Sequence, residues 1–173
     1  NKADDFGGGV YLKSVTDATI NGCVLNNNKA DHDAGDTTCY DKGMGGAIAS
    51  LQSTLTVTKC LFQQNLAQVT KAGAVPKAGN AGGGGDIYMQ TGVLKLLASR
   101  SEDAKAGIYV APAAISPGDS KNYFTGDGGS LLVHGTVADT SVEIRDCTFE
   151  NSIAYGNGGA VSLSKDSSPD GRQ

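Results

Sequence analysis

A Gly-Gly pair followed by an aliphatic residue recurs five times along the chain, and this recurrence constrains the fold more than any other feature. The copies are Gly7-Gly8-Gly9-Val10, Gly45-Gly46-Ala47-Ile48, Gly84-Gly85-Asp86-Ile87, Gly128-Gly129-Ser130-Leu131 and Gly158-Gly159-Ala160-Val161. The pairs lie 30 to 44 residues apart. Similar segments at such intervals are typical of proteins built from stacked repeats, in which each repeat contacts only its neighbours.

A second block follows each Gly-Gly pair. It has the pattern aliphatic-x-x-Cys-x-Phe/Leu-x-x-Asn/Ser-x-Ala, and it occupies residues 20–30, 57–67 and 144–154. Cys23, Cys60 and Cys147 stand at its fourth position. In the third repeat the block is degenerate, and our alignment places Leu97 in the cysteine position. Apolar and polar residues alternate in segments 53–58 and 141–145, which predicts strands with one buried face.

A short pair of strands cannot bury its own apolar face, so we expect successive repeats to stack about 4.8 Å apart, as in a parallel β-helix. Val10, Ile48, Ile87, Leu131 and Val161 would then form one internal column. The predicted fold is an all-β solenoid of roughly four to five coils, and residues 1–173 would be a single segment of a longer repeat protein. Segments 31–44, 68–82 and 105–127 interrupt the pattern and are predicted to be long loops on one edge.

Composition excludes several other classes of protein. Gly makes up 25 of 173 residues, but it does not recur at every third position and Pro occurs only four times, which excludes collagen. A pI near 5.0 and a net charge of −4, with no basic cluster, argue against a nucleic-acid partner. No apolar stretch approaches the ~20 residues of a transmembrane helix. The N-terminal residues lack a signal-peptide pattern, so we expect a fragment or a processed chain.

The motifs resemble those of a known family. Gly45-Gly46-Ala47-Ile48, Gly158-Gly159-Ala160-Val161 and Phe62-Gln63-Gln64-Asn65 are similar to the paired tetrapeptides of the chlamydial-type polymorphic membrane protein repeat. The resemblance covers residues 7–163, although Leu25 replaces Phe, Ser152 replaces Asn, and the third repeat lacks the second motif. It implies a right-handed parallel β-helix, export to the cell surface as an autotransporter passenger, an outer-membrane-associated location, and a role in adhesion.

Two columns of polar residues have structural interpretations. Cys23 and Cys60 would lie on adjacent coils, which allows either buried free thiols or a disulfide, because a disulfide needs Cα atoms 4.4–6.8 Å apart. A bridge from Cys39 is a third alternative. Asn28 and Asn65 occupy matching positions where the chain leaves a predicted strand. We expect their side-chain amides to stack in a column and to hydrogen-bond to one another. The alternative for the Phe-x-x-Asn surface, implied by the resemblance, is an adhesive epitope.

Few residues of the chain are candidates for a metal site or a catalytic centre. Asp31, Asp33 and Asp36 offer oxygen ligands at short spacing, so Ca²⁺ is the one cofactor we consider. A solvated acidic loop is the alternative, and His32 with Cys39 supplies only two of the ligands that zinc needs. We predict no catalytic or cofactor-binding residues. Glu143, Arg145 and Asp146 cluster in one repeat, but a glycosidase needs two carboxylates that flank one bond.

The expected function is therefore that of a non-catalytic extracellular or cell-surface module, acting in adhesion or as a structural stalk. Its partners would be a protein or a glycan, or neighbouring repeats of the same longer chain. One alternative is a carbohydrate-active β-helix enzyme, a polysaccharide lyase or hydrolase. Another is a structural subunit of a large extracellular or membrane-associated assembly.

Overall fold

The computed structural model describes residues 1–33, 42–70, 82–109, 126–135 and 138–164. Within these ranges every regular element is a β-strand. All strand pairs among them are parallel. The predicted all-β class with parallel pairing is confirmed. The described part of the chain contains no helix of the length and apolarity that a membrane span requires.

The strands form three sheets. The long sheet contains β2 (Val10–Lys13), β6 (Ile48–Thr58), β9 (Ile87–Leu97), β12 (Leu131–His134) and β16 (Val161–Ser164), with β3 (Ala18–Asn21) paired to β6 and β13 (Thr140–Arg145) paired to β9. The short sheet contains β4 (Val24–Asn26), β7 (Leu61–Gln63), β10 (Arg100–Glu102) and β14 (Thr148–Glu150). The insertion sheet contains β1 (Lys2–Ala3), β5 (Lys29–Asp33), β8 (Leu66–Thr70), β11 (Lys105–Tyr109) and β15 (Ile153–Ala154).

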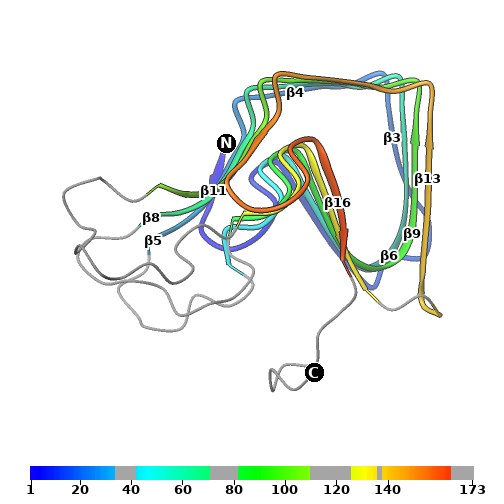
Figure 1. The fold of residues 1–173 in the computed structure, drawn as a ribbon. Helices are drawn as coiled ribbons and strands as arrows, with labels where there is room; N and C mark the ends of the chain where they lie inside the picture. Colours follow the sequence, from blue (N-terminus) through cyan, green and yellow to red (C-terminus); the bar gives the residue numbers. More distant parts are fainter. Residues whose placement is uncertain (34–41, 71–81, 110–125, 136–137, 165–173) are drawn as a thin grey trace.

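Successive repeats lie directly on one another. Repeat 1 comprises β2–β5, repeat 2 β6–β8, repeat 3 β9–β11 and repeat 4 β12–β15, while β16 begins a fifth. Figure 1 shows these turns of the chain superposed. The register places Val10, Ile48, Ile87, Leu131 and Val161 side by side, in agreement with the aligned motifs. The three central members are buried, and the two in the end repeats are partly buried against the same core.

The register corrects our alignment of repeat 3. Leu61 pairs with Arg100, so Cys60 lies beside Ser99 rather than beside Leu97. Leu97 pairs instead with Thr58, two positions earlier in the block. The alignment failed because it matched an apolar residue to cysteine, whereas repeat 3 uses a small hydroxyl side chain there. The Ser99 hydroxyl accepts a hydrogen bond from the Cys60 backbone N–H at 3.1 Å.

The first halves of β6 and β9 are buried on both faces, whereas residues 53–58 alternate as predicted between buried and partly buried side chains. Ile48 and Ile87 belong to the main core between the sheets. Ala49 and Tyr88 point the other way and pack in a second apolar cluster with Met44. Met44 belongs to the chain that returns from the first insertion. The alternating pattern could not reveal this burial, because the covering residue comes from a segment that we interpreted as a loop.

The two glycines of each pair meet different requirements. Gly45 has a φ of 66°, in the left-handed region that favours glycine. Gly46 has no such φ, but a Cβ there would overlap the backbone carbonyl oxygen of Gly85 in the next repeat. Gly159 holds the same position in the fifth repeat, and apart from its chain neighbours no heavy atom of the described residues lies within 4 Å of the place where its Cβ would be. The second glycine of the pair therefore makes room for the repeat that stacks on it.

Each turn from the short sheet to the insertion sheet passes through a residue with positive φ. Asn27, Gln64, Asp103 and Asn151 hold this corner, with φ values of 53°, 54°, 57° and 53°. Asn and Asp tolerate the left-handed backbone better than most residues do, which explains much of the polar composition of this corner. The preceding corner in repeat 3 carries the exposed Ala98 with a φ of 46°.

Candidate functional site

The three long insertions are attached at one place in the fold. β5, β8 and β11 lie side by side in the insertion sheet, and residues 34–41, 71–81 and 110–125, which follow them, lie outside the described residues (Figure 1). The return points also lie together, since the Gly82 N–H donates to the Lys42 carbonyl at 2.9 Å. The predicted loops 31–44, 68–82 and 105–127 begin too early, because 31–33, 68–70 and 105–109 continue the strands through pairing with their neighbours.

The aspartates proposed as calcium ligands do not share one loop. Asp31 is 6% exposed in β5, and its carboxylate lies 2.8 Å from Lys29 Nζ and 3.4 Å from Lys2 Nζ. Asp33 ends the same strand, and Asp36 lies outside the described residues. In the ranges that the structure describes, no three His, Cys, Asp or Glu side chains gather into a metal-binding group. Binding of Ca²⁺ to this segment stays a prediction.

The three described cysteines are free thiols. Cys60 is buried at 3% exposure, Cys147 is partly buried and Cys23 is exposed. Their column is therefore not buried throughout, because burial falls from Cys60 in repeat 2 to Cys23 in repeat 1. The Cys60 thiol donates to the Thr58 carbonyl at 3.3 Å, and no disulfide joins Cys60 to Cys23. Cys39 lies outside the described residues.

Asn28 and Asn65 form a buried column of side-chain amides. The Asn65 Oδ1 atom accepts hydrogen bonds from the backbone N–H of Asn28 at 2.9 Å and from its Nδ2 at 3.1 Å. The Asn65 Nδ2 atom donates to the Leu25 carbonyl at 2.9 Å. Asn1 Nδ2 extends the column by donating to Asn28 Oδ1 at 2.9 Å. These bonds join consecutive repeats through side chains in addition to the backbone pairing.

Repeat 3 continues the amide column with a carboxylate from the other motif. Ala104 stands where repeat 2 has Asn65, so the column loses its amide there. Asp86 stands where repeat 2 has Ala47. Asp86 Oδ1 accepts a hydrogen bond from Asn65 Nδ2 at 2.8 Å and thereby takes the place of the missing amide.

A chain of hydroxyl groups leads from Asp86 into repeat 4. Ser101 stands where repeat 2 has Phe62, and its Oγ donates to Asp86 Oδ2. The Ser101 Oγ lies 2.6 Å from the Ser130 Oγ, which lies 2.5 Å from the Ser152 Oγ. Because serine is smaller than phenylalanine, a cavity of about 10 Å³ borders Ser101 and Asp86. That volume holds about one water molecule.

The interior raises the pKa of Asp86. Its side chain is 1% exposed, and burial disfavours the charged form of a carboxyl group. Burial raises the pKa of Asp86 from 3.8 to about 7, although the hydrogen bonds from Ser101, Asn65 and Ser130 act in the opposite direction. Burial has the largest effect on this pKa, and the partners that act on it in the described part of the chain are neutral side chains.

Sequence reasoning treated Asp86 only as part of a Gly-Gly motif and missed its role. The signal was nevertheless present in the chain. The position after the Gly-Gly pair is Gly9, Ala47, Ser130 or Ala160 in the other repeats, and only repeat 3 has an acid there. The same repeat lacks the asparagine of the second motif. Because the added acid and the missing asparagine occur in the same repeat, the acid is a candidate to replace the asparagine.

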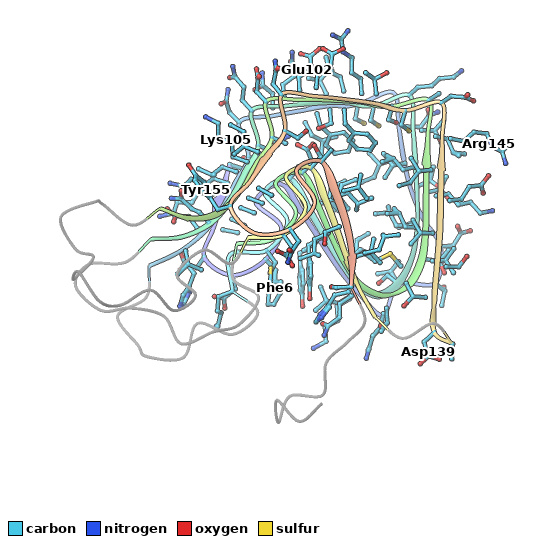
Figure 2. The ribbon with its side chains drawn as sticks, in the orientation of Figure 1. Phe6, Glu102, Lys105, Asp139, Arg145 and Tyr155 are labelled. Carbon is cyan, nitrogen blue, oxygen red and sulfur yellow. The ribbon has the colours of Figure 1, made fainter. Side chains whose placement is uncertain are left out.

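Glu143 and Arg145 lie on the outer face of β13 and bind each other through an ion pair. Arg145 points away from the molecule in Figure 2. The register aligns Glu143 with Lys95 and Thr56 of the neighbouring repeats, so this column offers no second carboxylate across its face. The arrangement resembles an exposed ion pair more than the paired acids of a glycosidase.

Comparison of the chain with protein-family models, with curated proteins and with solved structures gave no significant match.

Proposed function

We propose that the chain is a segment of a right-handed parallel β-helix that acts, without catalysis, as an adhesive or stalk module outside the cell or on its surface. The proposal includes membership of a polymorphic-membrane-protein type of repeat protein. The observation that carries it is the common attachment of the three insertions. β5, β8 and β11 are adjacent strands of one sheet, so the insertions begin at adjacent positions on a single edge.

A stack of this kind suits display better than catalysis. The described repeats are held in register by backbone pairing in three sheets and by the internal amide column. Such a body is stiff along its length and can present successive loops to one extended partner. A protein or a glycan chain fits this geometry, because either can contact several neighbouring insertions at once.

Further repeats of the same protein are the second kind of partner in this proposal. Leu163 of β16 is 66% exposed, whereas its partner Val133 in repeat 4 is 4% exposed. Leu163 therefore belongs to a column whose side chains are buried in the inner repeats. Gly159 adds support, because a glycine at its position elsewhere makes room for a stacked repeat. Uncovered parallel edges otherwise favour aggregation.

The experiment replaces residues 34–41, 71–81 and 110–125, singly and together, by short Gly-Ser linkers. Far-UV circular dichroism and thermal unfolding establish that the repeats still fold. Binding to host cells, extracellular matrix and a glycan array is then compared with that of the unchanged protein. We expect the triple replacement to abolish binding while the spectrum is retained.

A matched control lies on the other side of the molecule. Glu143→Gln with Arg145→Ala changes the outer face of β13 and leaves all insertions in place, so this variant should bind as the unchanged protein does. Binding that survives the triple replacement would refute the display function. Release of sugar products from polysaccharide, lost in the Glu143→Gln, Arg145→Ala variant, would instead favour an enzyme.

A further inference from the structure

We propose that Asp86 is a proton-binding site that controls how tightly repeats 3 and 4 stack, holding them together when protonated and loosening them when ionised. Asp86 belongs to the start of repeat 3, while Ser130 belongs to the start of repeat 4. The backbone N–H groups of Asp86 and Ile87 both donate to the Ser130 carbonyl at 2.9 Å. The carboxyl group thus lies at a junction between the two repeats. This inference does not depend on the proposed adhesive function.

Among the residues that the structure describes, the side-chain hydrogen-bond partners of Asp86 are all neutral. Asn65 Nδ2 and Ser101 Oγ donate to its two oxygen atoms, and the Ser130 hydroxyl, which also contacts Ser101, is a third neutral hydrogen-bond partner. An ionised Asp86 has only these donors to replace the water that it loses on burial. A protonated Asp86 needs no compensating charge and can itself donate a hydrogen bond. The neutral form therefore fits this interior better than the charged form.

The ionisable groups on the surrounding elements do not neutralise Asp86. Arg100 lies nearest in sequence to Ser101, but its side chain is 52% exposed and pairs with Glu102 at 2.7 Å and Glu150 at 2.8 Å. Glu102 points outward in Figure 2, as does Lys105 of β11. The other ionisable groups on the elements packed around Asp86 are Lys95 and Tyr88 in β9, His134 in β12 and Lys59, Cys60, Asp103 and Cys147 at the adjoining corners. Within the described ranges, the hydrogen-bond partners of Asp86 are instead Asn65, Ser101 and Ser130.

The hydroxyl chain gives the buried carboxyl group a route for proton exchange. Ser101, Ser130 and Ser152 connect Asp86 to the end of repeat 4 through successive short oxygen–oxygen contacts. Ser152 is partly exposed. Each hydroxyl can accept a proton on one side and donate one on the other, so a proton can pass without opening the core. Asp86 can therefore equilibrate with solvent while the repeats stay folded.

The sign of the effect follows from linkage. The pKa of Asp86 is about 7 in the folded chain, above its ordinary value of 3.8. Between pH 3.8 and about pH 7, Asp86 is protonated in the folded state and ionised in the unfolded state. The bound proton therefore stabilises the folded state in acid, and this stabilisation is lost as the pH rises through about 7. Each pH unit inside that window changes the folding constant about tenfold, so between pH 8 and pH 5 Asp86 should raise it roughly a hundredfold.

The first test is direct titration. Carbon-13 NMR of aspartate side chains in the unchanged protein should show one carboxyl group that titrates near neutral pH, and the same signal should be absent from Asp86→Asn. Urea unfolding at pH 5 and pH 8 should then show the hundredfold difference in folding constant in the unchanged protein, beyond that of Asp86→Asn. The amide of the variant keeps the shape of the protonated acid. If that variant does not fold, Asp86→Ser copies the residue found at the same position of repeat 4.

Glu102→Gln is the matched control, because it removes an outward-facing carboxylate from the same repeat and should leave the pH dependence intact. Hydrogen exchange supplies the readout of stacking. After correction for the intrinsic rate, protection of the Asp86 and Ile87 amides should fall from pH 5 to pH 8 in the unchanged protein and stay constant in Asp86→Asn. An aspartate titration confined below pH 5 would overturn the proposal. Equal pH dependence in the unchanged protein and Asp86→Asn would also overturn it.

Discussion

The Asn65→Ala variant tests whether the amide column holds the repeats together. Asn65 makes four hydrogen bonds, which satisfy Asn28 N–H, Asn28 Nδ2, the Leu25 carbonyl and the Asp86 carboxyl group. Asn65 and its three partners Asn28, Leu25 and Asp86 are all buried. Truncation removes all four bonds at once, and a buried polar group left without a partner costs about 1–3 kcal/mol. Partial repacking lowers the total cost of the four unsatisfied groups, so we expect the free energy of unfolding to fall by about 4 kcal/mol.

That loss is a large share of the net stability of roughly 5–15 kcal/mol typical of a folded domain. Urea unfolding followed by far-UV circular dichroism measures it, and the melting temperature should fall by about 10 °C. Asn26→Ala is the matched control, since Asn26 is exposed on β4 and removal of its amide should change stability by less than about 0.5 kcal/mol. If Asn65→Ala costs no more than the control does, the amide column does not stabilise the stack.

Three further variants or probes test other parts of the account. Gly46→Ala should destabilise the fold by more than about 3 kcal/mol because its Cβ meets the Gly85 carbonyl, whereas Gly159→Ala should be tolerated, and thermal unfolding compares them. Ala98→Gly should stabilise the protein by about 0.5–1 kcal/mol in urea unfolding, because it relieves a φ of 46° at an exposed position. Iodoacetamide should label Cys23 in the folded protein and Cys60 only after unfolding, as mass spectrometry would show.

The stacking of the repeats could be predicted because it depends on like residues at like positions. The aliphatic residue after each Gly-Gly pair must fill the same space in every repeat. The similar side chains of Ile48, Ile87 and Leu131 therefore predict that these residues pair with one another. The glycines were equally informative. The first glycine of a pair adopts a left-handed backbone and the second admits a carbonyl oxygen, and glycine suits either position because it has no Cβ.

What escaped prediction depends on contacts between residues far apart in the sequence. Ser99 takes the cysteine position through pairing with repeat 2, although Leu97 resembles cysteine more closely in polarity. Asp31 continues a strand because Gln68 lies beside it, while its charge suggested a loop. Tyr88 is buried by Met44, which lies in a return segment. In each case the neighbouring chain, and not the local sequence, determines the environment.

The role of Asp86 escaped for a related reason. An acid in a Gly-Gly motif has no obvious function until the register places it opposite Asn65 and beside Ser101. The loss of asparagine at Ala104 and the gain of Asp86 are 18 residues apart, yet they concern the same point of the interior. Only the stacked arrangement makes the two changes complementary.

Proton–proton contacts between repeats test the central claim most directly. A nuclear Overhauser spectrum of isotopically labelled protein should link backbone protons of Ile48 with those of Ile87, and those of Cys60 with Ser99, in the pattern of parallel strands. Contacts between Cys60 and Leu97, an antiparallel pattern, or an absence of contacts between the Gly-Gly repeats would contradict the stacked register.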